Sequence, residues 1–264
     1  MLLKIDHLTV SYGDRPVVKD FNLEMEEGEV VCLVGESGSG KTTVICSVLG
    51  LLPAAGKITS GDILFNGESL IGKTEKEFLS IRGRDMTMIF QDSGSMLNPV
   101  RKIGSQFVEY IRLHEKLSKT EAKKRAIEML EEVRLPDADN IMQSYPFELS
   151  GGMRQRVGIA MALAFHPKLL LADEPTSALD VTIQAQIVRQ MMELQKLEKT
   201  SIIIVTHNLG VATYMSNHII VMKNGEIVEA GTRDEIMYHP QHEYTKNLIA
   251  AIPTMEGEPY VEYE

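Results

Sequence analysis

The stretch Gly35-Glu36-Ser37-Gly38-Ser39-Gly40-Lys41-Thr42-Thr43 decides how this sequence folds. It matches the pattern G-x-x-x-x-G-K-[ST], a glycine-rich turn that holds phosphate groups. The apolar run 30–34 precedes it, and residues 43–49 follow with helical spacing. We therefore predict a buried strand, the turn and a helix, in that order. An ordinary glycine-rich turn is the alternative, and the flanking strand and helix patterns argue against it.

The residue types in this loop suit a bound nucleotide. Glycine lets the backbone wrap closely, so that N–H groups and the helix N-terminus face an anion. Lys41 is predicted to reach the β- and γ-phosphates of ATP, and Thr42 is predicted to place its hydroxyl on Mg²⁺. The other predicted nucleotide-binding residues of the loop are Gly35, Ser37, Gly38, Ser39, Gly40 and Thr43.

Length and composition predict one large α/β domain, or a core with an inserted subdomain, in a chain of 264 residues. No apolar run approaches the roughly 18 residues that span a bilayer. The N-terminus lacks a secretion signal, so we expect the protein on the cytoplasmic side, where it can dock on a membrane protein. The net charge of −10 argues against a broad nucleic-acid-binding surface. Cys32 and Cys46 lack the spacing of a metal site or a disulfide framework.

Alternating apolar residues predict two N-terminal strands, over 2–10 and 17–25, as an antiparallel layer beside a parallel core. Residues 54–60 are predicted to be a connector, and a strand is expected at 61–67. Buried strands are predicted at 86–90, 169–172 and 201–206. Helical patterning dominates residues 92–157, which we interpret as an inserted helical subdomain. Two capping boxes are predicted, at Ser118 to Glu121 and at Thr232 to Glu235.

Polar residues follow three of the predicted strands, at the carboxyl edge where open α/β sheets bind ligands. Asp173 is predicted to hold Mg²⁺ opposite Thr42, and Glu174 to orient or deprotonate the attacking water. A capping or solvated pair is the alternative for these two acids. His207 is predicted to contact the γ-phosphate or the water, although a lone histidine is more often structural. Gln91 is predicted to touch Mg²⁺ or the water.

A second candidate anion site begins a helix in Leu149-Ser150-Gly151-Gly152-Met153-Arg154-Gln155-Arg156. Ser150, Gly151 and Gly152 stand at the predicted helix N-terminus. If the first loop already holds the phosphates of one nucleotide, this site needs another, and a partner subunit is its expected source. Tyr12 lies where an aromatic ring could stack on a base, but taken alone it is more typical of a half-buried turn residue.

Taken together, these motifs resemble the ATPase subunits of ABC transporters, across essentially the whole chain. They occur in the order of that family: an A-loop aromatic, Walker A, Q-loop, signature, Walker B, D-loop and H-loop. The corresponding residues here are Tyr12, 35–42, Gln91, 149–153, 169–174, Ser177-Ala178-Leu179-Asp180 and His207.

The resemblance implies a P-loop NTPase fold, with an ATP-binding core over 1–91 and 158–264, an antiparallel β-subdomain, and a helical subdomain over 92–157. It implies ATP and Mg²⁺ as ligands, and it makes Tyr12 the expected adenine-stacking residue. It also implies a head-to-tail dimer with a second ATPase subunit, the same chain or a different one. Each of two ATPs would lie between one subunit's Walker A and the other's signature.

Residues 206–212 and 239–245 further resemble importers of the peptide and nickel group. Membership implies two transmembrane permease subunits and, indirectly, an extracytoplasmic substrate-binding protein. The protein would then lie peripherally on the cytoplasmic face of the membrane. The longer cysteine-bearing tail of many peptide-importer ATPases is missing, which points toward the shorter nickel- or metallophore-type members but does not decide. Oligopeptides, dipeptides and nickel or a metal complex are therefore all left open as the imported solute. A soluble ABC ATPase acting on the ribosome or DNA, and an exporter ATPase, are the alternatives.

Overall fold

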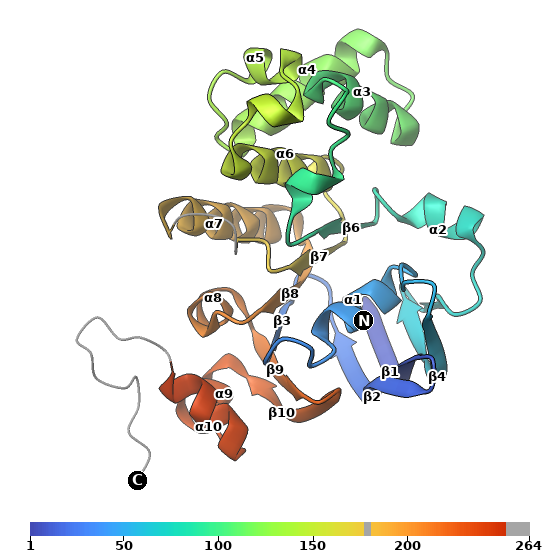
Figure 1. Cartoon of the computed structure of the whole chain (residues 1–264), viewed down its shortest axis with the longest axis vertical. Helices are drawn as coiled ribbons and strands as arrows, with labels where there is room; N and C mark the ends of the chain where they lie inside the picture. The colour runs from blue at the N-terminus through green and yellow to red at the C-terminus, as the bar shows by residue number, and fades with distance from the viewer. Residues whose placement is uncertain (177–180, 252–264) are drawn as a thin grey trace. The chain divides into compact units, whose positions relative to one another are not determined.

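The computed structural model describes residues 1–176 and 181–251, coloured along the chain in Figure 1. Packing divides the chain into two compact units, one of residues 1–79 with those from 201 onward, and one of residues 80–200. The division predicted from the sequence, with a helical subdomain over 92–157, remains a prediction. The predicted D-loop, Ser177 to Asp180, lies outside the described residues.

The first unit contains an antiparallel sheet of β1 (Leu3–Tyr12), β2 (Arg15–Met25), β4 (Gly56–Phe65) and β5 (Glu68–Ser69). Its strand order is β2-β1-β4-β5. This confirms the predicted antiparallel layer. The prediction of a connector as far as Ser60 was wrong, because β4 already begins at Gly56. Its first residues pair with the end of β1, from Tyr12 opposite Gly56 to Thr9 opposite Ser60. Residues 56–60 have little strand pattern in their sequence, and they form a strand because they pair with β1.

The same unit holds the strands that carry the phosphate loop. Their order is β10 (Glu226–Thr232), β9 (His218–Lys223), β3 (Val30–Val34) and β8 (Ser201–Thr206). β3 pairs in parallel with β8 on one side and with β9 on the other. Every residue of β3 and β8 is buried, as the continuous apolar runs predicted. The helices here are α1 (Lys41–Val48), α8 (Leu209–Met215), α9 (Arg233–Tyr238) and α10 (Glu243–Ala250).

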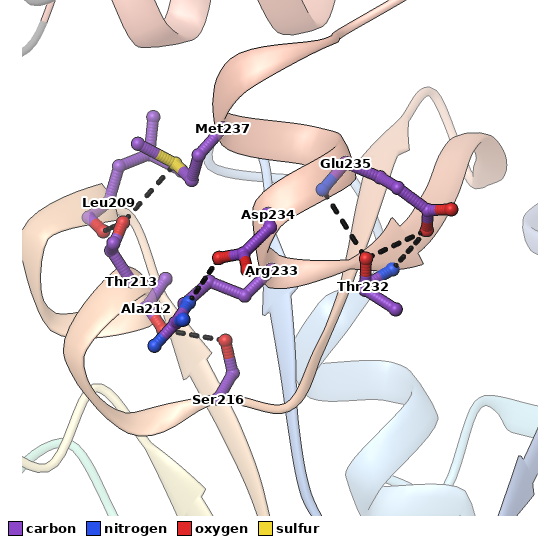
Figure 2. A network of polar contacts seen from close by, with 9 residues as sticks. All are labelled: Leu209, Ala212, Thr213, Ser216, Thr232, Arg233, Asp234, Glu235 and Met237. Carbon is purple, nitrogen blue, oxygen red and sulfur yellow. Dashed lines mark hydrogen bonds and ion pairs between the residues drawn. The ribbon is translucent and has the colours of Figure 1, made fainter.

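Figure 2 shows how α9 begins and how it contacts α8. Thr232 is the N-cap of α9; its hydroxyl accepts from the Glu235 N–H at 3.3 Å, and the Glu235 carboxylate accepts from the Thr232 N–H at 2.8 Å. This is the capping box that the sequence predicted. The Thr213 hydroxyl of α8 lies 3.2 Å from the Met237 sulfur of α9.

The second unit joins two parallel strands to a set of helices. β6 (Met86–Ile89) pairs with β7 (Leu169–Asp173), and the predicted capping box at Ser118 and Glu121 begins the long helix α4. The helices are α3 (Ile103–His114), α4 (Lys119–Glu132), α5 (Ala138–Gln143), α6 (Gly151–Leu163) and α7 (Val181–Glu198), with short 3₁₀ turns at Ser93–Met96 and Pro146–Glu148; α2 (Glu75–Ile81) spans the boundary of the units. Among the described residues, no helix has the length and apolarity needed to cross a membrane.

Two glycines, Gly61 within β4 and Gly67 just after it, provide a matched test of the strand packing. A Cβ atom on Gly61, whose φ is +92°, would lie 2.5 Å from the carbonyl oxygens of Asp6 and His7. Gly67 also has a positive φ, +79°, but a Cβ atom there would meet no atom within 4 Å. We expect Gly67→Ala to lower the free energy of unfolding by about 1 kcal/mol through backbone strain alone. Gly61→Ala should lower the free energy of unfolding by at least ~1 kcal/mol more than Gly67→Ala does, because β1 must also move.

Urea denaturation of both variants measures this difference. Equal losses would contradict the close approach of β4 to β1 as the constraint on Gly61.

Candidate functional site

The loop after β3 is shaped by glycines that no other residue could replace without a shift in the backbone. Gly35 and Gly40 have φ values of +148° and +100°. A Cβ atom on Gly35 would lie 2.2 Å from the Met222 carbonyl oxygen, and one on Gly40 would lie 2.8 Å from the Val17 carbonyl oxygen. Strands β9 and β2 therefore pack directly against the outside of the loop, and this packing fixes its curvature.

Lys41 is the first residue of α1, and only 6% of it is exposed. Its Nζ donates to the Gly35 carbonyl at 2.7 Å, the Glu36 carbonyl at 2.8 Å and the Ser39 hydroxyl at 3.2 Å. These three contacts orient the ammonium group inside the loop. A buried, oriented cation inside a glycine turn at a helix N-terminus fits a phosphate group, as the sequence predicted.

The rest of the loop presents both buried and accessible hydroxyls. Ser37, Gly38 and Thr42 are exposed, Ser39 is buried and Thr43 is half-buried. The predicted Mg²⁺ ligands, Thr42, Gln91 and Asp173, supply oxygen atoms, the donors that this hard cation prefers. Among the described residues, no cluster of three or more His, Cys, Asp or Glu side chains is placed to hold a metal ion.

His207 follows a strand that lies beside the strand leading into the loop. Val34 pairs with Thr206, so the chain leaves β3 at Gly35 and leaves β8 at His207 on the same edge of the sheet. The His207 side chain is exposed there. The structure thus brings these two residues together at one edge, while a contact of His207 with phosphate remains a prediction.

Tyr12 is the last residue of β1, directly opposite Gly56 of β4. It is half-buried, and a Cβ atom on Gly56 would lie 3.1 Å from Tyr12 Cε1. The missing side chain at Gly56 leaves room for the ring. Tyr12 is thus half-buried, as expected, but it lies at the end of a strand and not in a turn, and its stacking on adenine remains a prediction.

In the second unit, the predicted acids and the glutamine meet at the ends of two paired strands. Ile89 pairs with Ala172, so Gln91 and Glu174 both follow strand ends at one edge. Gln91 Nε2 donates to Glu174 Oε2 at 3.4 Å. Asp173, the last residue of β7, is buried and only 8% exposed.

Glu174 has an unusual backbone. Its φ is +44°, in the left-handed region that non-glycine residues rarely adopt. Pro175 follows, and a proline further restricts the residue before it, toward extended conformations. Strain of this kind persists only where the surroundings enforce it, and it is concentrated at functional sites.

The helix predicted at the second candidate anion site is present, and binding of an anion there remains a prediction. Ser150 is the N-cap of α6, and its hydroxyl accepts from the Met153 N–H at 3.3 Å. Ser150 and Gly151 are exposed, and Gly152 is half-buried. The accessible start of a 13-residue helix can receive an anion from another molecule.

Sequence reasoning missed a tyrosine that contacts the phosphate loop from 208 residues away. The hydroxyl of Tyr244, in α10, accepts from the Glu36 backbone N–H at 3.0 Å. Tyr244 is buried, which raises the pKa of its phenol, and Lys223 Nζ lies 4.5 Å from the ring centroid. The sequence pattern around Tyr244 gave a family resemblance but no signal for this contact. Gln155 stands within the motif at 149–156, whose residue pattern likewise gives no signal for its contacts.

Comparison with known proteins identifies the class. Residues 18–177 match the family model described as ABC transporter. The chain is 48% identical to the oligopeptide transport ATP-binding protein OppD of Bacillus subtilis, over 97% of this chain and 73% of that protein. It is 44% identical to the dipeptide transport ATP-binding protein DppD of Lactococcus lactis, over 97% of this chain and 75% of the relative.

A solved structure agrees with these relatives. It is a dimeric post-hydrolysis state of an ATP-binding cassette bound to ADP and Pi, with a TM-score of 0.79 and 29% identity over 88% of this chain and 99% of that one. Fold and site thus define an ATP-hydrolysing cassette with a P-loop NTPase fold. The chain belongs to the family of ABC transporter ATP-binding proteins, which confirms the resemblance drawn from its motifs.

The contact of Tyr244 with the loop predicts an effect on nucleotide binding. Tyr244→Phe keeps the ring but removes the acceptor for the Glu36 N–H, so this part of the loop loses one restraint. The loss of one hydrogen bond should raise the KM for ATP by about 2- to 10-fold, with kcat unchanged. Steady-state ATPase kinetics measure both constants. Tyr238→Phe, at a residue that is 50% exposed on α9, is the matched control and should match the wild type. An unchanged KM in Tyr244→Phe would contradict this role.

Proposed function

We propose that this chain powers the import of oligopeptides or dipeptides through a membrane ABC transporter. The observation that carries the proposal is its similarity, over 97% of its length, to ATP-binding proteins of oligopeptide and dipeptide transport. The names of these relatives favour peptides over nickel or a metallophore, the other substrates that the sequence left open. They also argue against an exporter, and against a soluble ATPase acting on the ribosome or DNA.

We assign each of the predicted site residues one role in ATP hydrolysis. Lys41 and the N–H groups of residues 35–42 bind the β- and γ-phosphates, and Tyr12 stacks on adenine. Glu174 accepts a proton from the attacking water, and Gln91 and His207 orient that water and the γ-phosphate. Bound Mg²⁺, held by Thr42, Asp173 and Gln91, would neutralise charge on the phosphate oxygens. Support for these roles comes from the buried Lys41 ammonium and from the Gln91–Glu174 contact.

A second ATPase subunit completes each site in this proposal. The exposed start of α6, at Ser150 and Gly151, receives the γ-phosphate of the nucleotide bound to the other subunit's loop. The dimeric arrangement of a similar solved cassette supports this pairing. The partner is a second copy of this chain or a different ATPase.

The remaining partners follow from the transport role. We infer two transmembrane permease subunits, which place the ATPase peripherally on the cytoplasmic face of the membrane, and an extracytoplasmic binding protein that delivers the peptide. Closure of the ATPase pair on ATP, and its reopening after hydrolysis, would switch the permease between its two orientations. No nucleic acid takes part.

Glu174→Gln tests the catalytic role and the transport role together. The amide keeps the size of the side chain but cannot accept a proton, so ATP binding should persist while turnover falls about 10²-fold or more. Cells that carry the variant should lose uptake of a radiolabelled tripeptide and retain uptake of radioactive nickel. Wild-type ATP turnover would contradict the role of Glu174. Loss of nickel uptake with intact peptide uptake would contradict the proposed substrate.

Ser150→Glu tests the shared site. It places a carboxylate where the partner's phosphates would lie, so it should abolish ATP-driven pairing and leave ATP binding to a single subunit within about 2-fold of the wild type. Light scattering with and without ATP, on the chain alone and mixed with the other ATPase of its transporter, measures pairing. Thr120→Glu, at an exposed residue of α4, is the matched control. Pairing that survives in Ser150→Glu would contradict a site shared between subunits.

A further inference from the structure

One buried side chain of the signature helix reaches the ends of both strands that carry the proposed catalytic groups. Gln155 lies in α6, five residues after Ser150, and only 2% of it is exposed. Its Nε2 donates to the Pro175 carbonyl at 3.0 Å and to the Phe90 carbonyl at 3.3 Å. A carboxamide nitrogen carries two hydrogens, so it can serve both carbonyls at once. Helix α6 packs against β6, which pairs with β7.

The two carbonyls belong to the chain neighbours of Gln91 and Glu174, two residues with proposed roles in hydrolysis. Phe90 directly precedes Gln91, and Pro175 directly follows Glu174. The side chains of Gln91 and Glu174 are themselves 3.4 Å apart. Gln155 therefore restrains the backbone next to both Gln91 and Glu174.

The restraint acts where the backbone is strained. Glu174 is left-handed, with φ of +44°, and a proline follows it. Without an external restraint, this residue would relax toward the extended conformations that precede prolines. Such a relaxation would turn the Glu174 carboxylate away, and displacements of about 1 Å can cost 10²-fold in rate. A hydrogen bond to the Pro175 carbonyl opposes that relaxation from the C-terminal side.

We propose that Gln155 is a positioning residue for ATP hydrolysis, which holds Gln91 and Glu174 in place from the signature helix. The inference rests on the proposed roles of those two residues. It makes α6 serve two nucleotides: its exposed start faces the ATP of the partner subunit, and Gln155 supports the groups that hydrolyse its own subunit's ATP. A shift of α6 when the two ATPase subunits pair would then displace Glu174 through the side-chain amide of Gln155. Core packing alone is the competing explanation for a buried glutamine.

Two variants separate positioning from packing in the assembled transporter. Gln155→Leu and Gln155→Met keep roughly the volume of the side chain and remove both donors. Since both variants lose the hydrogen bonds to the Phe90 and Pro175 carbonyls, kcat should fall about 10-fold or more. The KM for ATP should stay within about 2-fold, because the loop at 35–42 holds the phosphates. Gln186→Leu, at an exposed residue of α7, is the matched control and should leave both constants unchanged. An unchanged kcat in both donor-free variants would overturn the proposal, as would a parallel change in KM.

A double variant shows whether Gln155 acts through Glu174. If it does, Gln155→Leu added to Glu174→Gln should slow turnover no further than Glu174→Gln alone. A further 10-fold loss in the double variant would contradict the claim that Gln155 acts through Glu174. The single variant Glu174→Gln distinguishes a failure of the proposed function from a failure of the inference about Gln155. Wild-type turnover in Glu174→Gln would refute the role of Glu174 as the catalytic base. A slow Glu174→Gln together with a normal Gln155→Leu would refute only the inference about Gln155.

Discussion

The backbone of residues 35–41 must curl around a buried lysine ammonium, and this constraint governs the first unit. The curl requires residues with no Cβ at Gly35 and Gly40, because carbonyls of β9 and β2 occupy the space. It also requires a parallel strand on each side of β3, so that the loop leaves from the middle of a rigid edge. The continuous burial of β3 and β8 follows from the same need. A loop held this firmly has little to reorganise when it meets phosphate.

Two side chains distant in sequence support the two halves of the chemistry. Tyr244 fixes a backbone N–H of the loop, and Gln155 fixes the turns beside Gln91 and Glu174. The first acts on the group that holds the nucleotide, and the second on the groups that would hydrolyse it. Each contact lies within one of the two compact units, so each can be explained without reference to the other.

The parts that were predictable are those whose signal is local in sequence. Strand β3 was predicted at its observed bounds, Val30–Val34, because an apolar run and a glycine motif mark both ends. The capping box at Ser118 was predicted from a four-residue pattern. In contrast, Gly56 to Ser60 forms a strand only because β1 pairs with it. Tyr244 and Gln155 act through hydrogen bonds to segments elsewhere in the chain, and sequence periodicity gives no signal for such bonds. The left-handed backbone of Glu174 likewise arises from its surroundings and not from its residue type.

The central claim is that the loop at 35–42 holds only half of a nucleotide site and that a second ATPase subunit supplies the rest. The most direct measurement is a structure of the assembled transporter, carrying Glu174→Gln to slow turnover, with ATP and Mg²⁺ bound. The account predicts that Lys41 contacts the β- and γ-phosphates while the signature serine of the other ATPase subunit contacts the same γ-phosphate, and that Ser150 of this chain faces the second nucleotide. A nucleotide enclosed by this chain alone, with Ser150 left in solvent, would contradict it.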